Sequence, residues 1–296
     1  MELTYVICPE DAGLELLDIL RIKLRLSMTQ IRRLKRENGI FIRGESVYTN
    51  YRVSPGEPVS VYINEHAPEI PAEKGSLNIV YEDDWLMVVN KPRGVFTHPS
   101  RSRYSGTLMN FALAHILDTG GESCHVVNRL DRDTSGLILM TKSGYAKALC
   151  AHTDMEKRYT ALVFGVPEKK ADKIRLAIKR AREREMRRIA APDGAAAVTR
   201  YQVLRTFRGF SLLDLVLETG RTHQIRVHLS TIGHPVLGDK LYGTPESLEM
   251  AAKLGAEPHM LHASRLQFAH PLTGRQLDLH CLPDWAQMLD NRWVWK

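Results

Sequence analysis

Apolar residues near the N-terminus recur at helical spacing and predict two short helices, at about 13–25 and 28–37. Ser27 stands where the second helix would begin, and its side chain can cap the first turn. The stretch GIFIRGESV then has the pattern of a hairpin, and VSPGEPVSVYI continues as a strand after a Pro-Gly turn. Residues 1–65 therefore predict one small α+β unit.

The pattern changes after residue 65. The stretch HAPEIPAEKGS, residues 66–76, has two prolines, a glycine and mixed charge without periodicity, and so predicts a linker. Beyond it, strands are predicted in LNIVYED, WLMVVNKP, LILMTKS, YTALVFGVP, TRYQVLRTF and SLLDLVLETG, and helices at 107–118 and about 144–155 interrupt them. Because few strands alternate regularly with helices, residues 77–296 predict an α+β domain with a mixed, mainly antiparallel sheet.

Positive charge is concentrated in two parts of the chain. The 296 residues carry a formal net charge of +7, which indicates a polyanionic partner. Residues 21–36 contain seven Lys or Arg and no acidic residue. In the second stretch, 168–189, predicted as a helix or loop, positions 169–188 hold ten Lys or Arg against three acidic residues. This second cluster is either a solvated segment or a second surface for phosphates, whose binding would weaken steeply with salt.

Cysteine spacing and hydropathy bear on the compartment. The four cysteines, Cys8, Cys124, Cys150 and Cys281, form no C-x-x-C pair, so we expect free thiols in a reducing environment. The N-terminus has no apolar signal segment, and nowhere do 18 uncharged apolar residues follow one another. The sequence therefore predicts a soluble, cytoplasmic protein with no membrane span.

Side chains suited to catalysis gather in three separate segments: NKPRGVFTHP (90–99), VNRLDRDTSGL (127–137) and ETGRTHQIRVHLSTIGHPVLGD (218–239). The third contains His223 and His228, whose spacing raises the question of a metal. Arg226 lies between them and no acidic or Cys ligand stands beside them, so a metal site is disfavoured. The chain also has no G-x-S-x-G motif, which argues against a serine hydrolase of that type.

Several motifs, in one order, resemble the RluA/RluD-type family of RNA pseudouridine synthases. They are YEDDWLMVVNKPRGVFTHP, RLDRDTSGLILMTKS, EKRYTALVFG, GRTHQIRVHLSTIGHPVLGDKLYG and HASRLQFAHPLTG, and the likeness runs from Ile79 nearly to the C-terminus. The stretch SMTQIRRLKRENGIFIRGESV resembles, less strongly, the S4-type RNA-binding domain that often precedes this catalytic domain. The resemblance implies an isomerase that converts specific uridines to pseudouridine with no metal and no cofactor.

The resemblance also implies roles for individual residues. Asp131 of RLDRDTSG would be the essential nucleophilic carboxylate, which attacks a sugar or base carbon or abstracts a ribose proton. Arg226 of HQIRVH would keep it ionised, and Tyr159 of EKRYTALV would stack under the target base and move a proton. Arg129 would hold the flipped-out nucleotide. Further substrate-binding residues would be Arg221, Lys91 and His98, and the RNA-binding residues of the N-terminal unit would be Arg21, Arg25, Arg32, Arg33, Lys35 and Arg36.

The neighbours of Asp131 are expected to shape its loop. Thr134 and Ser135 can hydrogen-bond the turn backbone after Asp133, itself a structural turn residue, and so fix the direction of the Asp131 side chain. The family most often has His where this chain has Asn128, immediately before the Arg-Leu-Asp triplet. Because Asn supplies a similar neutral donor, we expect activity to survive and assign no catalytic role to this position.

The sequence also bears on two other classes of function. A non-catalytic RNA-binding or ribosome-assembly factor would use the basic segments alone, and it has no need of a buried carboxylate facing an anionic ligand. A glycoside hydrolase would need a second carboxylate as acid, and no motif position offers one. The expected target is large-subunit ribosomal RNA, with transfer RNA as the alternative, and the protein is expected to act as a monomer.

Overall fold

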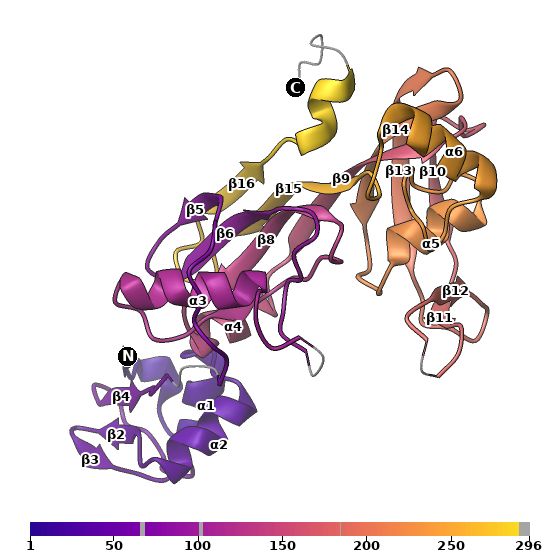
Figure 1. The fold of residues 1–296 in the computed structure, drawn as a ribbon. Coiled ribbons are helices and arrows are strands. Elements are labelled where there is room, and N and C mark those ends of the chain that lie inside the picture. The colour runs from indigo at the N-terminus through magenta and orange to yellow at the C-terminus, as the bar shows by residue number, and fades with distance from the viewer. Residues whose placement is uncertain (66–68, 101–102, 184, 290–296) are drawn as a thin grey trace.

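The computed structural model describes residues 1–65, 69–100, 103–183 and 185–289. Its N-terminal unit is a four-stranded antiparallel sheet in the order β1-β4-β2-β3, packed against two helices (Figure 1). The elements of this unit are β1 Glu2–Val6, a 3-10 turn Pro9–Asp11, α1 Leu16–Ile22, α2 Met28–Arg36, β2 Ile40–Ile42, β3 Glu45–Ser46 and β4 Pro58–Tyr62. The small α+β unit predicted from the sequence is therefore present.

Local signals explain where these elements begin and turn. The Ser27 hydroxyl accepts a hydrogen bond from the Gln30 amide, and the Gln30 side chain accepts one from the Ser27 amide, so α2 starts at the predicted cap. At the turn between β2 and β3, Arg43 and Gly44 have φ angles of 52° and 83°, as a tight two-residue hairpin requires. Both predicted helices are confirmed, although α1 is shorter than expected.

The larger part of the chain is built on one 10-stranded sheet. Its order is β10-β13-β14-β9-β15-β8-β6-β5, with β16 beside β15 and β7 beside β8. The described pairs are antiparallel except β8 with β15, so the predicted mixed, mainly antiparallel sheet is confirmed. The strands are β5 Ile79–Glu82, β6 Leu86–Lys91, β7 His125–Val126, β8 Ser135–Thr141, β9 Met155–Phe164, β10 Ala171–Arg175, β13 Val198–Phe207, β14 Phe210–Leu217, β15 Leu261–Ala269 and β16 Gln276–His280.

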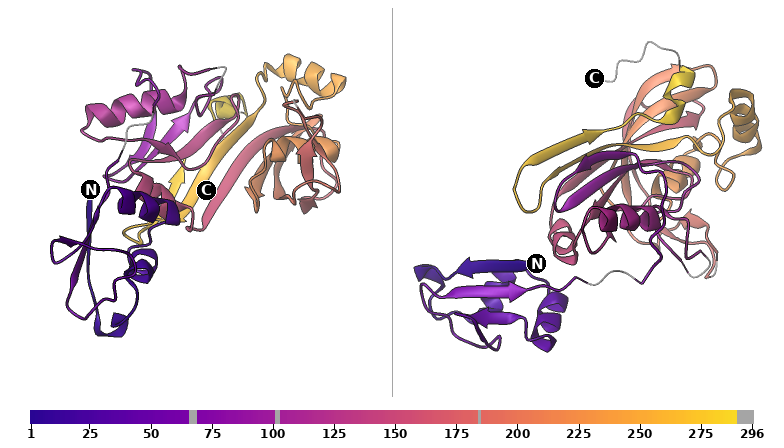
Figure 2. Two further views of the ribbon diagram at one scale, coloured as in Figure 1. Left: turned by 90° about the horizontal axis from the view of Figure 1, so that it is seen from below. Right: turned by 60° about the vertical axis from the view of Figure 1, so that its left-hand side comes forward.

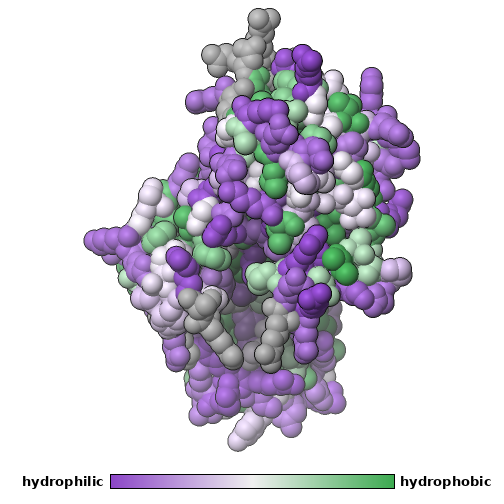
Figure 3. All heavy atoms as spheres, turned by 45° about the vertical axis from the view of Figure 1, so that its right-hand side comes forward, coloured by the Kyte–Doolittle hydropathy of each residue, from purple (hydrophilic) through white to green (hydrophobic). Residues whose placement is uncertain are grey.

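The sheet joins two lobes (Figures 1 and 2). One lobe carries β5, β6 and β8 with two helices, the other carries β10, β13 and β14 with two more, and the long strands β9 and β15 run between them. The helices are α3 Leu108–Asp118, α4 Gly144–Cys150, α5 Gln224–Thr231 and α6 Pro245–Leu254, followed by a 3-10 helix at Asp284–Leu289. The molecular surface is hollowed between the lobes, and hydrophilic side chains predominate around this hollow (Figure 3).

Two element predictions need correction. The basic stretch 168–189 is not a helix or loop: it contains β10 and then a two-stranded hairpin of β11, Ile178–Arg180, and β12, Arg188–Ala190. The reason is an alternation of apolar residues, in which Ile174 and Ile178 are buried and Leu176 between them is partly buried. The predicted helix at 144–155 ends at Cys150, because β9 begins at Met155.

Residues 69–76, the described part of the predicted linker, contain no helix or strand, yet they contact α3. The Asn110 side-chain amide donates to the carbonyl of Pro71 at 2.8 Å. A Cβ atom on Gly75 would lie 2.4 Å from the Phe111 ring, so only glycine allows the chain to pass this close. This segment is therefore held against the larger part of the chain.

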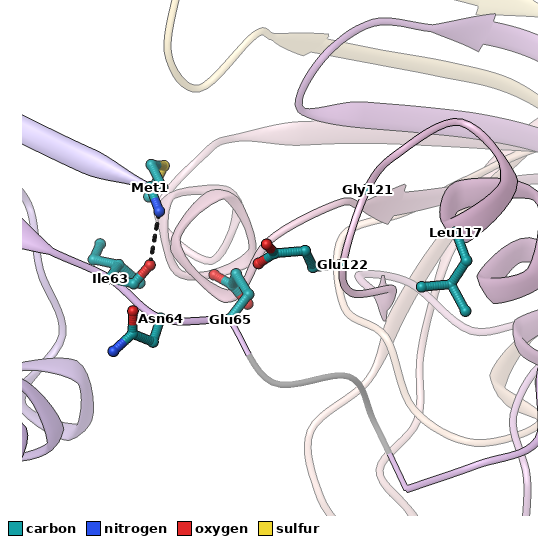
Figure 4. Close-up of a pocket in the computed structure, with 7 residues that line it drawn as sticks. All are labelled: Met1, Ile63, Asn64, Glu65, Leu117, Gly121 and Glu122. Carbon is teal, nitrogen blue, oxygen red and sulfur yellow. Dashed lines mark hydrogen bonds between the residues drawn. The ribbon is translucent and has the colours of Figure 1, made fainter.

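The N-terminal unit also shares its apolar core with α4. Tyr145 and Leu149 of α4 are buried among the core residues of that unit, and the Tyr145 hydroxyl donates to the carbonyl of Leu24 at 3.0 Å. At the same junction the Glu65 carboxylate accepts hydrogen bonds from the Ser123 hydroxyl and the Gly144 amide. Figure 4 shows the pocket beside this junction, lined by Met1, Ile63, Asn64, Glu65, Leu117, Gly121 and Glu122.

Among the described residues, no helix combines the length and the apolar character that a membrane-spanning helix needs.

Candidate active site

The loop between β7 and β8 carries Asp131, and contacts on both sides fix it. The Thr97 hydroxyl donates to the carbonyl of Leu130 at 2.8 Å. The Lys91 ammonium donates to the carbonyl of Arg132, also at 2.8 Å. The residues before and after the aspartate are thus tied to the end of β6 and to the segment that follows it. This explains why NKPRGVFTHP accompanies RLDRDTSG: the first motif holds the loop that the second one forms.

Lys91 does not reach a substrate in this arrangement. Its side chain is fully buried, and its three N–H groups donate to the carbonyls of Pro92, Val95 and Arg132, each at 2.8 Å. Burial lowers the pKa of Lys91 to about 7, and the negative charges of two nearby carboxylates oppose this shift. The predicted substrate-binding role of Lys91 is therefore replaced by a structural one.

Arg226, on α5, joins two carboxylates. Its Nη1 donates to Asp131 Oδ2 at 2.8 Å, while its Nε and Nη2 donate to the two oxygens of Asp239 at 2.7 and 2.9 Å. The Arg226 side chain is 9% exposed, that of Asp239 is 0% exposed and that of Asp131 is 28% exposed. The partly exposed Asp131 is therefore held by Arg226, and the buried Asp239 fixes the orientation of that arginine.

The titration of this group follows from burial and pairing. Burial raises the pKa of Asp239, but the hydrogen bonds and charge of Arg226 outweigh it and hold the pKa below its usual value. Burial lowers the pKa of Arg226, and here the contacts with Asp239 outweigh it and raise the pKa. Both groups therefore stay ionised near neutral pH.

A histidine and a tyrosine complete the surroundings of Arg226. His223 precedes α5 in the left-handed conformation, with φ of 58°. Its Nδ1 lies 2.8 Å from the Tyr242 hydroxyl and its Nε2 lies 3.7 Å from Asp131 Oδ2. The Tyr242 ring lies 5.0 Å from the Arg226 guanidinium, a cation–π distance. Burial is the main cause that lowers the pKa of His223, so its ring is neutral near pH 7.

Tyr159 lies on β9 and is 6% exposed. Burial chiefly, and the negative charge of Asp131 in addition, raise the pKa of its hydroxyl. The phenol therefore keeps its proton at neutral pH. The structure thus brings the three residues predicted as catalytic, Asp131, Arg226 and Tyr159, into one neighbourhood from three different elements.

Thr134 and Ser135 do not bond the turn backbone through their side chains, contrary to the prediction. The Thr134 hydroxyl lies 2.8 Å from Nε2 of His259, and the Ser135 hydroxyl lies 2.8 Å from Nδ1 of His262. Burial above all lowers the pKa of both histidines to about 4, so their rings are neutral partners. The loop after Asp131 is thus held by two buried histidines that the turn chemistry did not indicate.

Asn128 has a structural role. Its side-chain amide donates to the carbonyl of Leu137 at 3.3 Å, and its side-chain oxygen accepts from the Leu139 amide at 2.7 Å. Both bonds satisfy backbone groups of β8, so the side chain extends the pairing of that strand. Nothing in this geometry requires a histidine at the position.

The remaining predicted substrate-binding residues stay at the surface. Arg129 is exposed two residues before Asp131, and His98 is exposed next to Thr97. Arg221 is exposed too, and its Nε donates to the carbonyl of Ala196 at 3.1 Å. All three therefore border the segments that build the site.

The basic residues of the N-terminal unit divide into two groups. One group is exposed: Arg32, Lys35 and Arg36 line a shallow groove along α2 together with Thr29, and Arg21 is exposed on α1. The other group is tied to backbone carbonyls. Arg25 donates to Pro271 at 3.2 Å, and Arg33 donates to Asn64 and pairs with Glu37. The structure leaves the first group available to an anionic partner and uses the second within the chain.

His223 and His228, the pair whose spacing raised the question of a metal, both make contacts within the chain. His228 is fully buried, with Nδ1 2.9 Å from the Thr199 hydroxyl and Nε2 2.9 Å from the carbonyl of Leu176. Among the described residues, the one cluster with metal-ligating atoms close together is Cys8, Glu10 and Asp11 in the N-terminal unit. There, Asp11 already pairs with Lys23 at 3.0 Å.

Sequence reasoning missed Asp239, His223 and Tyr242 as parts of the site. A signal for Asp239 was present, since an acidic residue directly after the apolar run of PVLGD has to find a partner if it is buried. For Tyr242, no pattern distinguished the residue from an ordinary core aromatic.

Comparisons with known proteins agree with this geometry. A family model described as RNA pseudouridylate synthase matches residues 85–231. An uncharacterized RNA pseudouridine synthase of Bacillus subtilis, YlyB, is 36% identical over 276 residues, covering 90% of this chain and 89% of that protein. The ribosomal large subunit pseudouridine synthase D of Zymomonas mobilis is 37% identical over 227 residues, covering 72% and 71%. The structure of human RNA pseudouridylate synthase domain containing 1 superimposes with a TM-score of 0.58 at 28% identity, covering 74% of this chain and 89% of that one.

Proposed function

The chain belongs to the RluA/RluD-type family of RNA pseudouridine synthases, isomerases that act on RNA, and on this premise we propose that Asp131 is the nucleophile. The observation that supports this is the one-sided pairing of its carboxylate. Arg226 and His223 both approach Oδ2, and among the described residues Oδ1 has no hydrogen-bond partner. One oxygen is therefore anchored while the other is left for the reacting nucleotide.

The reaction breaks the N1–C1′ bond of uridine, rotates the uracil and rejoins it through C5. In the proposed mechanism Asp131 enters this sequence as an anion, whose charge the Arg226 guanidinium stabilises. Arg226 in turn keeps its direction because Asp239 holds its other two nitrogens. The side chains of Asp131 and Arg226 thus need no rearrangement when the substrate arrives.

Tyr159 is proposed to lie under the target base. Its buried ring offers an aromatic face, and its hydroxyl keeps a proton at neutral pH because burial raises its pKa. Arg129, exposed beside the loop of Asp131, is proposed to hold the nucleotide that has been flipped out of its helix. His98 and Arg221 remain proposed contacts at the border of the site.

We propose that residues 1–65 are an S4-like RNA-binding domain, residues 66–76 a linker and residues 77–296 the catalytic domain. The exposed arginines and lysine along α2 support an RNA contact there. Large-subunit ribosomal RNA is the proposed target, because relatives in Zymomonas mobilis and Haemophilus influenzae carry that substrate in their names. Transfer RNA is the alternative. We further propose that the protein is a monomer and that it is cytoplasmic, where four free cysteines are expected to stay reduced.

The test combines mutation with mapping. Asp131→Asn should abolish pseudouridine formation with little change in folding or RNA affinity, because an isosteric amide replaces the carboxylate and its negative charge is lost. Asp133→Asn, in the same loop but paired with Arg132 instead, is the matched control and should remain active. Pseudouridines are mapped in ribosomal and transfer RNA from cells that lack the gene and express each variant. Product formation by Asp131→Asn would overturn the assignment, and a lost site in transfer RNA would overturn the proposed target.

A further inference from the structure

The hairpin of β11 and β12 carries arginines that the chain itself does not neutralise. Several lysines nearby are paired, since Lys173 contacts Glu218 at 2.9 Å and Lys179 contacts Asp193 at 2.7 Å. Among the described residues, no carboxylate lies within ion-pair distance of Arg180 or Arg188. The positive charge of this hairpin that has no carboxylate partner in the described part of the chain is therefore that of Arg180 and Arg188.

The two arginines face each other across the hairpin. Arg180 and Arg188 are direct partners in the antiparallel register of β11 and β12, so their side chains leave the same face of the ribbon. Like charges directly opposite each other destabilise a strand pair. An anion between them would remove that repulsion, and guanidinium groups are well suited to bind phosphate oxygens.

Arg188 is also anchored at the site of Asp131. Its main-chain amide donates to the Tyr242 hydroxyl at 2.9 Å, and that hydroxyl lies 2.8 Å from His223 Nδ1. β12 packs against α5, the helix that carries Arg226. The end of the hairpin next to its turn, where Arg180 and Arg188 pair, is therefore fixed beside the site.

The side chain of Arg188 has a buried donor without a partner. Its Nε is shielded from solvent, and among the described residues nothing accepts its hydrogen bond. A buried polar group of this kind indicates a missing partner, and for a guanidinium the partner is an acceptor or an anion.

The net charge of the side chains around Asp131 is negative, so a further positively charged side chain would help RNA to bind there. Asp131 and Asp239 carry two negative charges against the single positive charge of Arg226 between them. A phosphodiester that approaches this group meets net repulsion unless another cation stands beside it. Arg188 supplies a positive charge there, close enough to act on the titration of His223.

We propose that Arg188, with Arg180 opposite it, binds a backbone phosphate of the RNA strand next to the flipped nucleotide. This inference rests on the proposed function, because it takes RNA at Asp131 as given. It makes the β11–β12 hairpin a contact element at the site, separate from the basic groove of α2.

The experiment measures RNA binding in the Asp131→Asn background, so that turnover does not change the probe. The probes are unmodified transcripts of large-subunit ribosomal RNA and of transfer RNA, at about 50 to 200 mM salt. Arg188→Gln removes the charge and keeps much of the length, Arg188→Lys keeps the charge, and Arg180→Gln tests the opposite strand. Arg208→Gln, an exposed arginine in the turn between β13 and β14, is the matched control.

Losing one phosphate contact should lower the slope of log K against log salt by about 0.7 to 0.9. We expect that change for Arg188→Gln and for Arg180→Gln, recovery of the slope in Arg188→Lys, and the parent slope in Arg208→Gln. If the unpartnered Nε merely binds water, Arg188→Gln keeps the slope, and the proposal is then wrong. Because this readout needs no isomerisation, it can fail while Asp131 is upheld as the nucleophile, and the reverse is also possible.

Discussion

Replacing Asp239 by asparagine should damage catalysis from a position that does not touch the substrate. Asp239 accepts two hydrogen bonds from Arg226 and two from the amides of Leu241 and Tyr242. Asparagine has one oxygen in place of two, so at least one N–H of Arg226 would face another N–H. The guanidinium would also lose its buried counter-charge.

The magnitude follows from these contacts. Removing one partner of a buried ion pair costs about 3–5 kcal/mol. The remaining bond from Arg226 to Asp131, whose side chain is 28% exposed, offsets part of this cost. We therefore expect Asp239→Asn to lower the free energy of unfolding by about 3 kcal/mol. A misdirected Arg226 would no longer hold Asp131 in place, and a displacement near 1 Å costs roughly 100-fold in rate.

The assay pairs urea unfolding with single-turnover pseudouridine formation at saturating RNA. Asp214→Asn is the matched control. Asp214 is a part-buried carboxylate that pairs with Arg158 at 3.1 Å, and the Arg158 side chain leaves the face of β9 opposite to that of Tyr159. It should lose some stability and keep its rate. If folded Asp239→Asn kept the wild-type single-turnover rate, Arg226 would not need its hydrogen bonds to Asp239, and our account of the site would fail.

Three further outcomes are expected. Tyr159→Phe keeps the aromatic face and loses the hydroxyl, so RNA should still bind in a filter assay while the single-turnover rate falls about 100-fold; an unchanged rate would exclude a proton role. Burial lowers the pKa of His259 from 6.5 to about 4, so the unfolded chain takes up the proton first. Stability that is complete above pH 6.5 should therefore decline toward pH 4, by at most roughly 3 kcal/mol for this group, and His259→Gln should flatten the decline in urea titrations. Gly136→Ala would bring a Cβ within 2.3 Å of the backbone of β15 at a φ of 113°, so it should cost about 3 kcal/mol or more, whereas Gly94→Ala, with open space around it, should cost less.

Much of the fold could be predicted because strand signals in this chain are strong. The run from 135 to 141 is buried at every position, and a strand was predicted there from the apolar letters of LILMTKS. The basic stretch was misread because charge obscured a period of two at Ile174, Leu176 and Ile178. Helix α5 was not predicted, since its polar letters are buried by pairing with distant groups and not by hydrophobicity.

The residues proposed as catalytic could be predicted from the sequence, but the residues that hold them in place could not. Family motifs named Asp131, Arg226 and Tyr159, and the structure brings them together. The burial of Lys91 could not be predicted, because three carbonyls converge on it only when two distant loops meet. For Asp239 the sequence could signal that a buried partner was needed but could not name it, because that partner lies 13 residues earlier on another element.

The shared core between α4 and the N-terminal unit limits how the chain can be dissected. Tyr145 and Leu149 are 7% and 2% exposed because that unit covers them. A truncated enzyme lacking residues 1–65 would present both side chains to water, at roughly 1.5–3 kcal/mol for each fully uncovered apolar side chain. Truncation would thus expose an apolar patch that favours aggregation, as well as remove a basic surface. The N-terminal unit therefore cannot be exchanged on its own, and a chimera would have to keep α4 together with the N-terminal unit that covers it.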